Sequence, residues 1–239
     1  MRELKLGDLL TDAWEVYKTN IGVWILASLL YYVLISISAV LCYFPVFFVA
    51  PPLTAGMYLI ALNHLRYNRV EIGDLFKGFE NYGAVLVTAL VMIGISILCY
   101  LPGIIFQVIG AIITQASYES GGGFEAIGVV FSVFGVLLYL AGLVPIFYFM
   151  TRFLFVFLLI MDKKIGFKEA YQLSKEKVQE GFWNALLIYI VSAVVGSIGM
   201  FACGIGILFT FPLMFIMQAV AYHRLYTPEM PTILSAKSQ

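Results

Sequence analysis

The sequence predicts an all-α, polytopic membrane helix bundle with about six transmembrane helices, arranged as three hairpins. Composition is the first observation: 62% of the 239 residues are hydrophobic and 12% are charged, against about 45–50% and about 25% in soluble domains. The second is the spacing of the charges. The run from Ile21 to Ala50 holds no Asp, Glu, Lys or Arg, and roughly 20 such residues cross a hydrocarbon core of about 30 Å.

An internal repeat is the third observation. One plan occurs three times, in pseudo-repeats of roughly 1-67, 70-162 and 163-227, within a single integral membrane domain over 1-239. Each copy begins with an amphipathic segment, and an apolar hairpin follows it. Membrane folds are often built from such repeats. The three segments open on a hydrophobic residue and a glycine: Leu6-Gly7, Ile72-Gly73 and Ile165-Gly166.

The amphipathic segments carry apolar side chains on one helical stripe and charged side chains off it. Met1 to Asn20 lacks the apolar core of a cleavable signal peptide. Helices of this kind lie in the headgroup plane of a bilayer, or they dock onto the protein's own loops, and both alternatives stay open. The stripes are Leu6, Leu9, Leu10, Ala13, Trp14 and Tyr17 in the first segment, and Phe167, Tyr171, Ser174 and Val178 in the third.

Six spans follow from the apolar runs. The second helix of the first and third hairpins leaves the bilayer in a basic and aromatic sequence around His64 and His223. We expect these histidines to be interfacial anchors rather than metal ligands. The predicted spans are Ile21 to Tyr43, Val46 to Leu65, Tyr82 to Leu101, Pro145 to Met161, Phe182 to Cys203, and Ile207 to Tyr222.

The basic residues predict the orientation of these spans. Thirteen of the 14 Lys and Arg lie near the N-terminus, in Arg66–Lys77, in Lys163–Lys177 or after Tyr222. Because basic residues stay on the cytoplasmic side, we expect both termini to be cytoplasmic. The opposite side carries only Glu119 and Glu125.

The middle hairpin is too long for a simple crossing. A helix from Tyr82 to Ser117 would measure about 54 Å at 1.5 Å per residue. We therefore predict helix breaks at Pro102-Gly103 and at Gly142-Pro145, because an interior proline removes a hydrogen bond and kinks the axis. The alternatives are strong tilting, or an apolar arm over 103–143 that projects from the bilayer and needs a partner, such as another copy.

Arg152 is the one basic residue inside a predicted span. A charge near the centre of a bilayer needs a polar partner. The candidates are carbonyls near Pro145, the side chains of Gln107 or Gln218, tyrosine hydroxyls, or an exogenous anion such as a phospholipid headgroup. We therefore predict a lipid or anion site of Arg152, Gln107 and Gln218, with a purely structural arginine as the alternative.

Other chemistry finds little support in the sequence. The three cysteines, Cys42, Cys99 and Cys203, are an odd number in apolar surroundings, so we expect buried packing; a three-thiolate site for a soft metal is the alternative. The predicted spans hold no Asp or Glu, and no nucleophile with a base is recognisable. The formal net charge of zero gives no sign of nucleic-acid binding. We expect no enzyme, no cofactor and no metal.

Several motifs resemble those of the six-helix superfamily that includes the membrane part of some bacterial glycerophosphodiester phosphodiesterases. The resemblance implies a prokaryotic inner (plasma) membrane protein. It transfers no active site, because the catalytic domain of those enzymes is a separate soluble barrel. The motifs are Asp74-Leu75-Phe76-Lys77-Gly78-Phe79, Phe167-Lys168-Glu169-Ala170-Tyr171-Gln172-Leu173-Ser174, Gly181-Phe182-Trp183, Gly204-Ile205-Gly206-Ile207, Phe211-Pro212-Leu213 and Ala221-Tyr222.

The expected function is that of a non-enzymatic membrane protein that engages membrane lipids, a second copy of itself or a membrane protein partner. The amphipathic segments and the over-long middle hairpin indicate this function. The alternative is a small transporter or channel for an anionic solute, in which Arg152 binds the solute beside broken helices.

Overall fold

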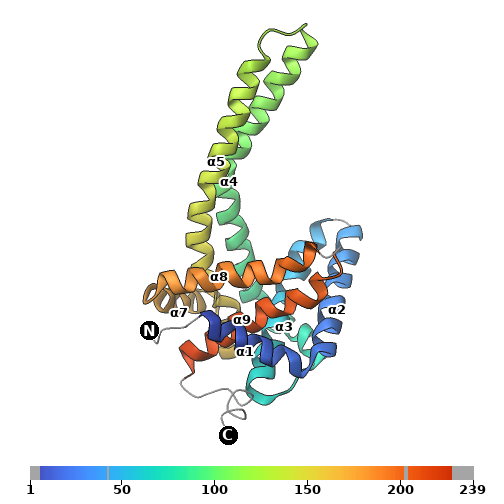
Figure 1. Cartoon of the computed structure of the whole chain (residues 1–239), viewed down its shortest axis with the longest axis vertical. Helices are drawn as coiled ribbons and strands as arrows, with labels where there is room; N and C mark the ends of the chain where they lie inside the picture. Colours follow the sequence, from blue (N-terminus) through green and yellow to red (C-terminus); the bar gives the residue numbers. More distant parts are fainter. Residues whose placement is uncertain (1–5, 42, 202–203, 228–239) are drawn as a thin grey trace. The chain divides into compact units, whose positions relative to one another are not determined.

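A computed structural model describes residues 6–41, 43–201 and 204–227 of the chain, and the described residues contain helices and no β-strand (Figure 1). The all-α class is thereby confirmed. The chain divides into two compact units. The first, here called the core unit, comprises Met1–Ala89 and Thr151–Gln239, and the second, the hairpin unit, comprises Leu90–Met150.

The helices follow one another with short connections. In chain order they are α1 Leu6–Thr19, α2 Ile21–Leu41, α3 Tyr43–Tyr67, the 3₁₀ segment η1 Ile72–Phe79, α4 Tyr82–Glu119, α5 Glu125–Phe153, α6 Val156–Lys163, α7 Phe167–Gln179, α8 Phe182–Ser197, the 3₁₀ segment η2 Ile198–Phe201, and α9 Ile207–Tyr226.

In the described part of the chain, six helical segments are long and apolar enough to cross a membrane, and the protein is therefore a membrane protein. These candidate spans agree in number and approximate position with the predicted ones, except that the two middle ones are much longer. They are Ile21–Val40, Pro45–Tyr67, Tyr82–Glu119, Glu125–Lys163, Phe182–Phe201 and Ile207–Tyr226.

The centre of the core unit is formed by α3, α6 and α9. Helix α3 packs against both α6 and α9, while α2 packs on α3 and α8 packs on α9. Phe155, Phe215 and Tyr222 are fully buried at this centre. Large apolar side chains thus fill the middle of the unit.

Two glycines allow η1 to lie directly against α3. A Cβ atom on Gly56 would stand 2.0 Å from the carbonyl oxygen of Leu75, and one on Gly78 would stand 1.8 Å from the carbonyl oxygen of Pro52. Any other residue would push the two backbones apart. Leu75 is fully buried as a result, so η1 is packed against the middle of a candidate span.

The other two amphipathic segments also dock on helices of the core unit. Helix α1 packs on α9, and α7 packs on α6. The docked face of α1 consists of Leu9, Ala13, Val16 and Tyr17, whereas Leu10 and Trp14 of the predicted stripe remain 37% and 47% exposed. These segments therefore contact helices of the core unit, and a position in the headgroup plane stays a prediction.

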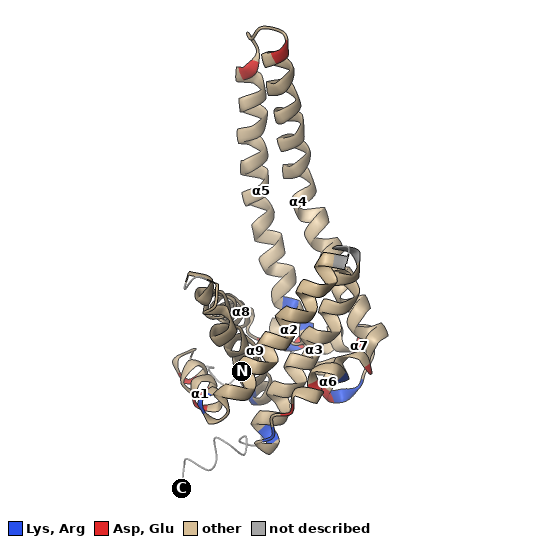
Figure 2. Cartoon of the chain, turned by 90° about the vertical axis from the view of Figure 1, so that its right-hand side faces the viewer, with Lys and Arg blue, Asp and Glu red and all other residues tan. Residues whose placement is uncertain are grey.

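The hairpin unit consists of α4 and α5, which lie side by side and antiparallel in Figures 1 and 2. Glycines bring the two backbones together: a Cβ atom on Gly110 would lie 2.7 Å from the carbonyl oxygen of Gly128, and one on Gly103 would lie 3.0 Å from that of Gly135. Small residues permit this close approach of membrane helices. These glycines of α4 and α5 therefore face each other inside the hairpin, and the larger apolar residues point outward.

The predicted helix breaks are wrong. Helix α4 runs unbroken through Pro102-Gly103 over 38 residues, and α5 runs through Gly142 and Pro145 over 29 residues. The interruption lies instead at Leu154-Phe155, between α5 and α6. A proline deletes only one backbone hydrogen bond, and a helix in an apolar medium keeps its remaining bonds because no water competes for them.

Candidate functional site

Arg152 lies on the last turn of α5, and its side chain is half-buried. Its carbonyl oxygen accepts a hydrogen bond of 2.8 Å from the Ser174 hydroxyl of α7. The ring of the next residue, Phe153, lies 5.0 Å from the ring of Tyr171. Helix α7 therefore covers the junction of α5 and α6. The predicted span from Pro145 to Met161, which we expected to be one straight helix, is interrupted at this junction.

The two glutamines predicted beside Arg152 have other surroundings. Gln218 is buried; its Oε1 accepts a hydrogen bond from the Tyr58 hydroxyl at 2.5 Å, and its Nε2 donates to the Ser192 hydroxyl at 2.8 Å. These bonds tie α9 to α3 and α8. Gln107 belongs to the hairpin unit, where a Cβ atom on Gly135 would lie 2.8 Å from its backbone nitrogen. Gln218 thus has a structural role, and an anion site of all three residues stays a prediction.

A half-buried ion pair joins the three central helices of the core unit. Arg66 of α3 donates from both guanidinium nitrogens to the Asp162 carboxylate of α6, with Nη2 to Oδ2 at 2.9 Å. The Tyr222 hydroxyl of α9 donates to the same Oδ2 at 2.7 Å. A two-pronged arginine–carboxylate pair is the strong geometry for such a contact. With three donors around it, Asp162 serves to hold helices together rather than to move protons.

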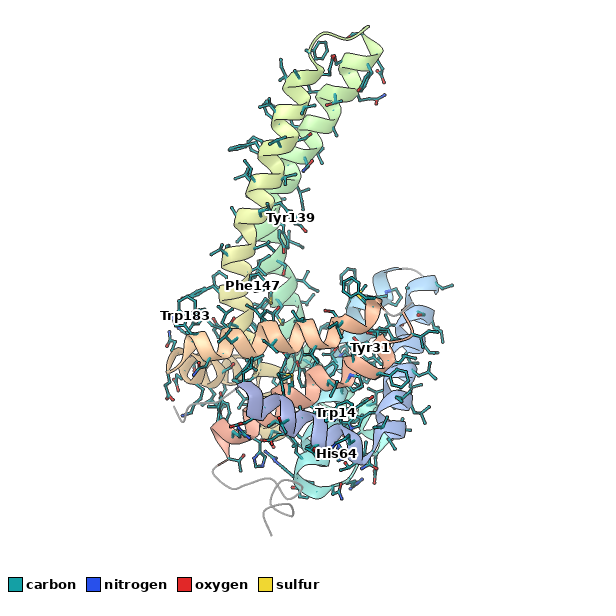
Figure 3. The ribbon with its side chains drawn as sticks, viewed as in Figure 1. Trp14, Tyr31, His64, Tyr139, Phe147 and Trp183 are labelled. Atoms are coloured by element: carbon teal, nitrogen blue, oxygen red, sulfur yellow. The ribbon has the colours of Figure 1, made fainter. Side chains whose placement is uncertain are left out.

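His64 of α3, labelled in Figure 3, is fully buried within the protein, and its position at the membrane interface stays a prediction. The indole nitrogen of Trp24 donates to its Nδ1 at 3.1 Å. Nε2 therefore carries the proton, and it donates at 2.8 Å to the hydroxyl of Thr19, which itself donates to the Val16 carbonyl. This tautomer is assigned from the hydrogen-bond network. Both ring nitrogens are used within the protein, and they anchor the start of α2 to α3.

Two further acidic residues secure the docked segments. Asp74 of η1 is fully buried; its Oδ2 accepts a hydrogen bond from Asn63 of α3 at 2.7 Å, and its Oδ1 lies 2.5 Å from Lys77. This contact raises the pKa of Lys77. Asp12 of α1 pairs with Arg224 of α9. Segments η1 and α1 are therefore each fixed by a carboxylate as well as by apolar contacts.

Within the described residues, no group of three or more His, Cys, Asp or Glu is arranged to hold a metal ion. Cys99 lies on α4 as a free thiol. Cys42 and Cys203 lie outside the described residues, so the three-thiolate alternative stays a prediction.

A shallow apolar groove runs along α4 in the hairpin unit. Its cavity volume is about 360 Å³. The ring of Tyr100 at the groove stacks on Tyr139 of α5, with ring centroids 4.4 Å apart. An extended hydrocarbon chain matches the apolar lining. The groove is lined by Met92, Ile93, Ser96, Ile97, Tyr100, Ile104 and Met150.

Comparison with known proteins gives no relative for this chain. No family model, no curated protein and no solved structure matches it. The resemblance to the glycerophosphodiester phosphodiesterase membrane domain therefore stays a prediction, and the functional argument depends on the residues and contacts described above.

Sequence reasoning missed the carboxylates that hold the core unit together. Asp12, Asp74 and Asp162 each lie at or beyond the end of a predicted apolar run, where a solvated position is the ordinary expectation. The partners lie up to 212 positions away in the sequence, and no local pattern identifies them.

Proposed function

We propose that the chain is a non-enzymatic integral membrane protein of the prokaryotic inner membrane that presents its hairpin unit to a partner within the bilayer. The partner is membrane lipid or a membrane protein, including a second copy of this chain. Both termini lie on the cytoplasmic side. The hairpin unit carries the proposal.

The outward faces of the hairpin are apolar over a length that exceeds the bilayer core. No charge occurs between Leu90 and Tyr118, a length of about 43 Å, against about 30 Å of hydrocarbon. Leu98, Val130 and Val144 are 72%, 65% and 73% exposed. Figure 2 shows both stems uncharged and acidic residues at the tip. Surfaces of this kind need a lipid or protein cover.

The docked segments support three hairpins of common design. Each amphipathic segment packs on the final helix of another repeat. Segment η1 packs on α3, α7 packs on α6, and α1 packs on α9. The same relation recurs around the unit, and the contact of α1 with α9 closes the ring. This cyclic pattern supports the internal repeat and the placement of the six spans as three successive hairpins.

The engaged polar groups support a non-enzymatic role. Asp162 accepts three hydrogen bonds, Asp74 is bound by Asn63 and Lys77, and both nitrogens of His64 are occupied. A general base needs a position from which it reaches a substrate proton. These groups instead face partners on neighbouring helices.

A shortened hairpin tests the proposal. Gly103 faces Gly135 and Gly110 faces Gly128, so deletion of 104–110 together with 128–134 removes seven residues from each helix and keeps Gly103 opposite Gly135. The core unit is expected to fold unchanged, as measured by circular dichroism in mild detergent. Native mass spectrometry is expected to show loss of bound lipid, partner or oligomer.

The matched control keeps the hairpin length and changes only the tip, by Glu119→Gln. It is expected to retain the wild-type lipid and subunit masses. Unchanged masses in the shortened protein would overturn the proposal.

A second candidate function is transport of an anionic solute. The helix interruption at Leu154-Phe155 lies next to Arg152, and discontinuous helices beside a charge are typical of transporter binding sites. In proteoliposomes this candidate predicts anion flux that Arg152→Gln abolishes and Arg152→Lys partly keeps. Absence of flux in the wild-type protein would reject it.

A further inference from the structure

Apart from Arg152, which is described above, the Lys and Arg side chains of the described residues divide into two sets. Six belong to ion pairs with Asp or Glu, and their charge is compensated locally. Four lysines have no ion pair within 4.0 Å in the described part of the chain, and all lie within one stretch: Lys163, Lys164, Lys168 and Lys175. The compensated residues are Lys18, Arg66, Arg69, Lys77, Lys177 and Arg224.

Three of these lysines form the turn between α6 and α7, here called the basic corner, residues 163–168. Lys163, Lys164 and Lys168 are exposed, and the corner is blue in Figure 2. No acidic residue lies among them. The preceding Asp162 is engaged by Arg66 and Tyr222.

Apolar and aromatic side chains accompany the lysines. Ile165 and Phe167 are half-buried between them, and the ammonium of Lys163 lies 5.7 Å from the ring centroid of Tyr226. The exposed Glu169 follows Lys168 directly, and consecutive helical residues do not face each other. The corner therefore combines positive charges that form no ion pair with another described residue with side chains that favour the membrane interface.

The backbone at Lys164 is a second, independent observation. Lys164 has φ 53°, in the left-handed region, and it ends α6. Asn68 ends α3 with φ 52°. Asparagine adopts this conformation readily, whereas lysine does so at a conformational cost. Lysine at this position supplies charge that asparagine does not, and such strained residues cluster at functional sites.

We propose that the basic corner binds the phosphate group of anionic phospholipid headgroups at the membrane surface. The inference rests on the proposed function in one respect, which is that the chain lies in a bilayer. Clustered lysines next to a span attract anionic lipid electrostatically, and each lysine ammonium offers three donors to phosphate oxygens. The apolar side chains between the lysines keep them at headgroup depth.

The test uses the full-length protein in nanodiscs of mixed phosphatidylglycerol and phosphatidylcholine, followed by native mass spectrometry of retained lipid. The variant carries Lys163→Gln, Lys164→Asn and Lys168→Gln, in which asparagine suits the left-handed backbone. Retention of phosphatidylglycerol is expected to fall ~10- to 100-fold, with phosphatidylcholine unchanged. The control removes three compensated charges: Lys18→Gln, Arg69→Gln and Lys177→Gln.

Equal retention in the variant and the wild type would overturn the proposal, as would an equal loss in the control. Lys163→Arg with Lys168→Arg keeps the charge and is expected to retain the lipid, which separates lost charge from a folding defect. Inorganic phosphate in excess is expected to leave lipid retention in place; displacement by it would assign the corner to free phosphate and overturn the lipid site. The shortened hairpin is expected to lose lipid, partner or oligomer bound at the hairpin but to keep the phosphatidylglycerol that depends on the three lysines, so the two proposals fail separately.

Discussion

Replacing Gly56 by alanine tests the closest helix crossing in the core unit. The added methyl carbon would stand 2.0, 2.6 and 2.7 Å from the carbonyl oxygen, carbonyl carbon and Cα of Leu75. All three are backbone atoms, so no side-chain rotation relieves the overlap. Since carbon atoms pack at about 3.5–4.0 Å, α3 and η1 must move apart by roughly 1 Å.

Two contributions set the magnitude. Overpacking of a tight contact costs about 1–3 kcal/mol. Separation also stretches the 2.7 Å hydrogen bond from Asn63 to the fully buried Asp74, and an unsatisfied buried group costs about 1–3 kcal/mol. We therefore expect Gly56→Ala to lower the free energy of unfolding by about 2–6 kcal/mol.

The assay is equilibrium unfolding in mixed micelles, followed by circular dichroism. Gly7→Ala is the matched control, because a Cβ atom on Gly7 of α1 meets nothing within 4 Å. Alanine is the better helix former, so this change is expected to raise stability by up to about 1 kcal/mol. If Gly56→Ala unfolds at the wild-type denaturant concentration, η1 does not lie against α3 and the reasoning is refuted.

Three further predictions concern the polar contacts of the core unit. Arg66→Met leaves the half-buried Asp162 without its cation and is expected to cost about 2–4 kcal/mol in the same unfolding assay; a loss below about 1 kcal/mol would contradict a pair that is shielded from solvent. Asp12→Arg and Arg224→Asp are each expected to lower the free energy of unfolding, and the double variant is expected to recover most of the loss. If the losses of the two single variants simply add in the double variant, the two side chains are not in contact. Trp24→Phe removes the donor to Nδ1 of His64 and is expected to cost about 1–3 kcal/mol. The two tryptophans that remain in this variant, Trp14 and Trp183, are 47% and 74% exposed. The fluorescence spectrum of the variant is therefore expected to lie at longer wavelength than that of the wild type, and an unchanged spectrum would contradict the burial of Trp24.

The number and rough position of the candidate spans could be predicted because hydropathy measures the free energy of transferring a segment from water into the bilayer. The helix breaks could not. Pro102 and Pro145 have the same local effect on a helix in water and in lipid, yet in lipid the freed backbone groups have no solvent to bond. Helices α4 and α5 therefore continue through them, and the interruption falls at Leu154-Phe155, a pair that carries no proline or glycine.

The contacts that fix the core unit depend on topology rather than on local pattern. Asp12 and Arg224 are ordinary polar residues until α1 and α9 come together. Gln218 was recognised as polar in an apolar span, and its partners Tyr58 and Ser192 required the fold. Gly56 likewise looks like any other glycine in the sequence, because only the crossing of η1 gives it a role.

Sidedness tests the proposed membrane arrangement most directly. In the proposed arrangement, the tip of the hairpin unit lies outside the cell and the basic corner lies in the cytoplasm. A membrane-impermeant maleimide applied to intact cells is expected to label Glu119→Cys, and to label Lys168→Cys only after lysis, with the wild-type cysteines as the background. Labelling of Lys168→Cys in intact cells, with Glu119→Cys protected until lysis, would contradict the account.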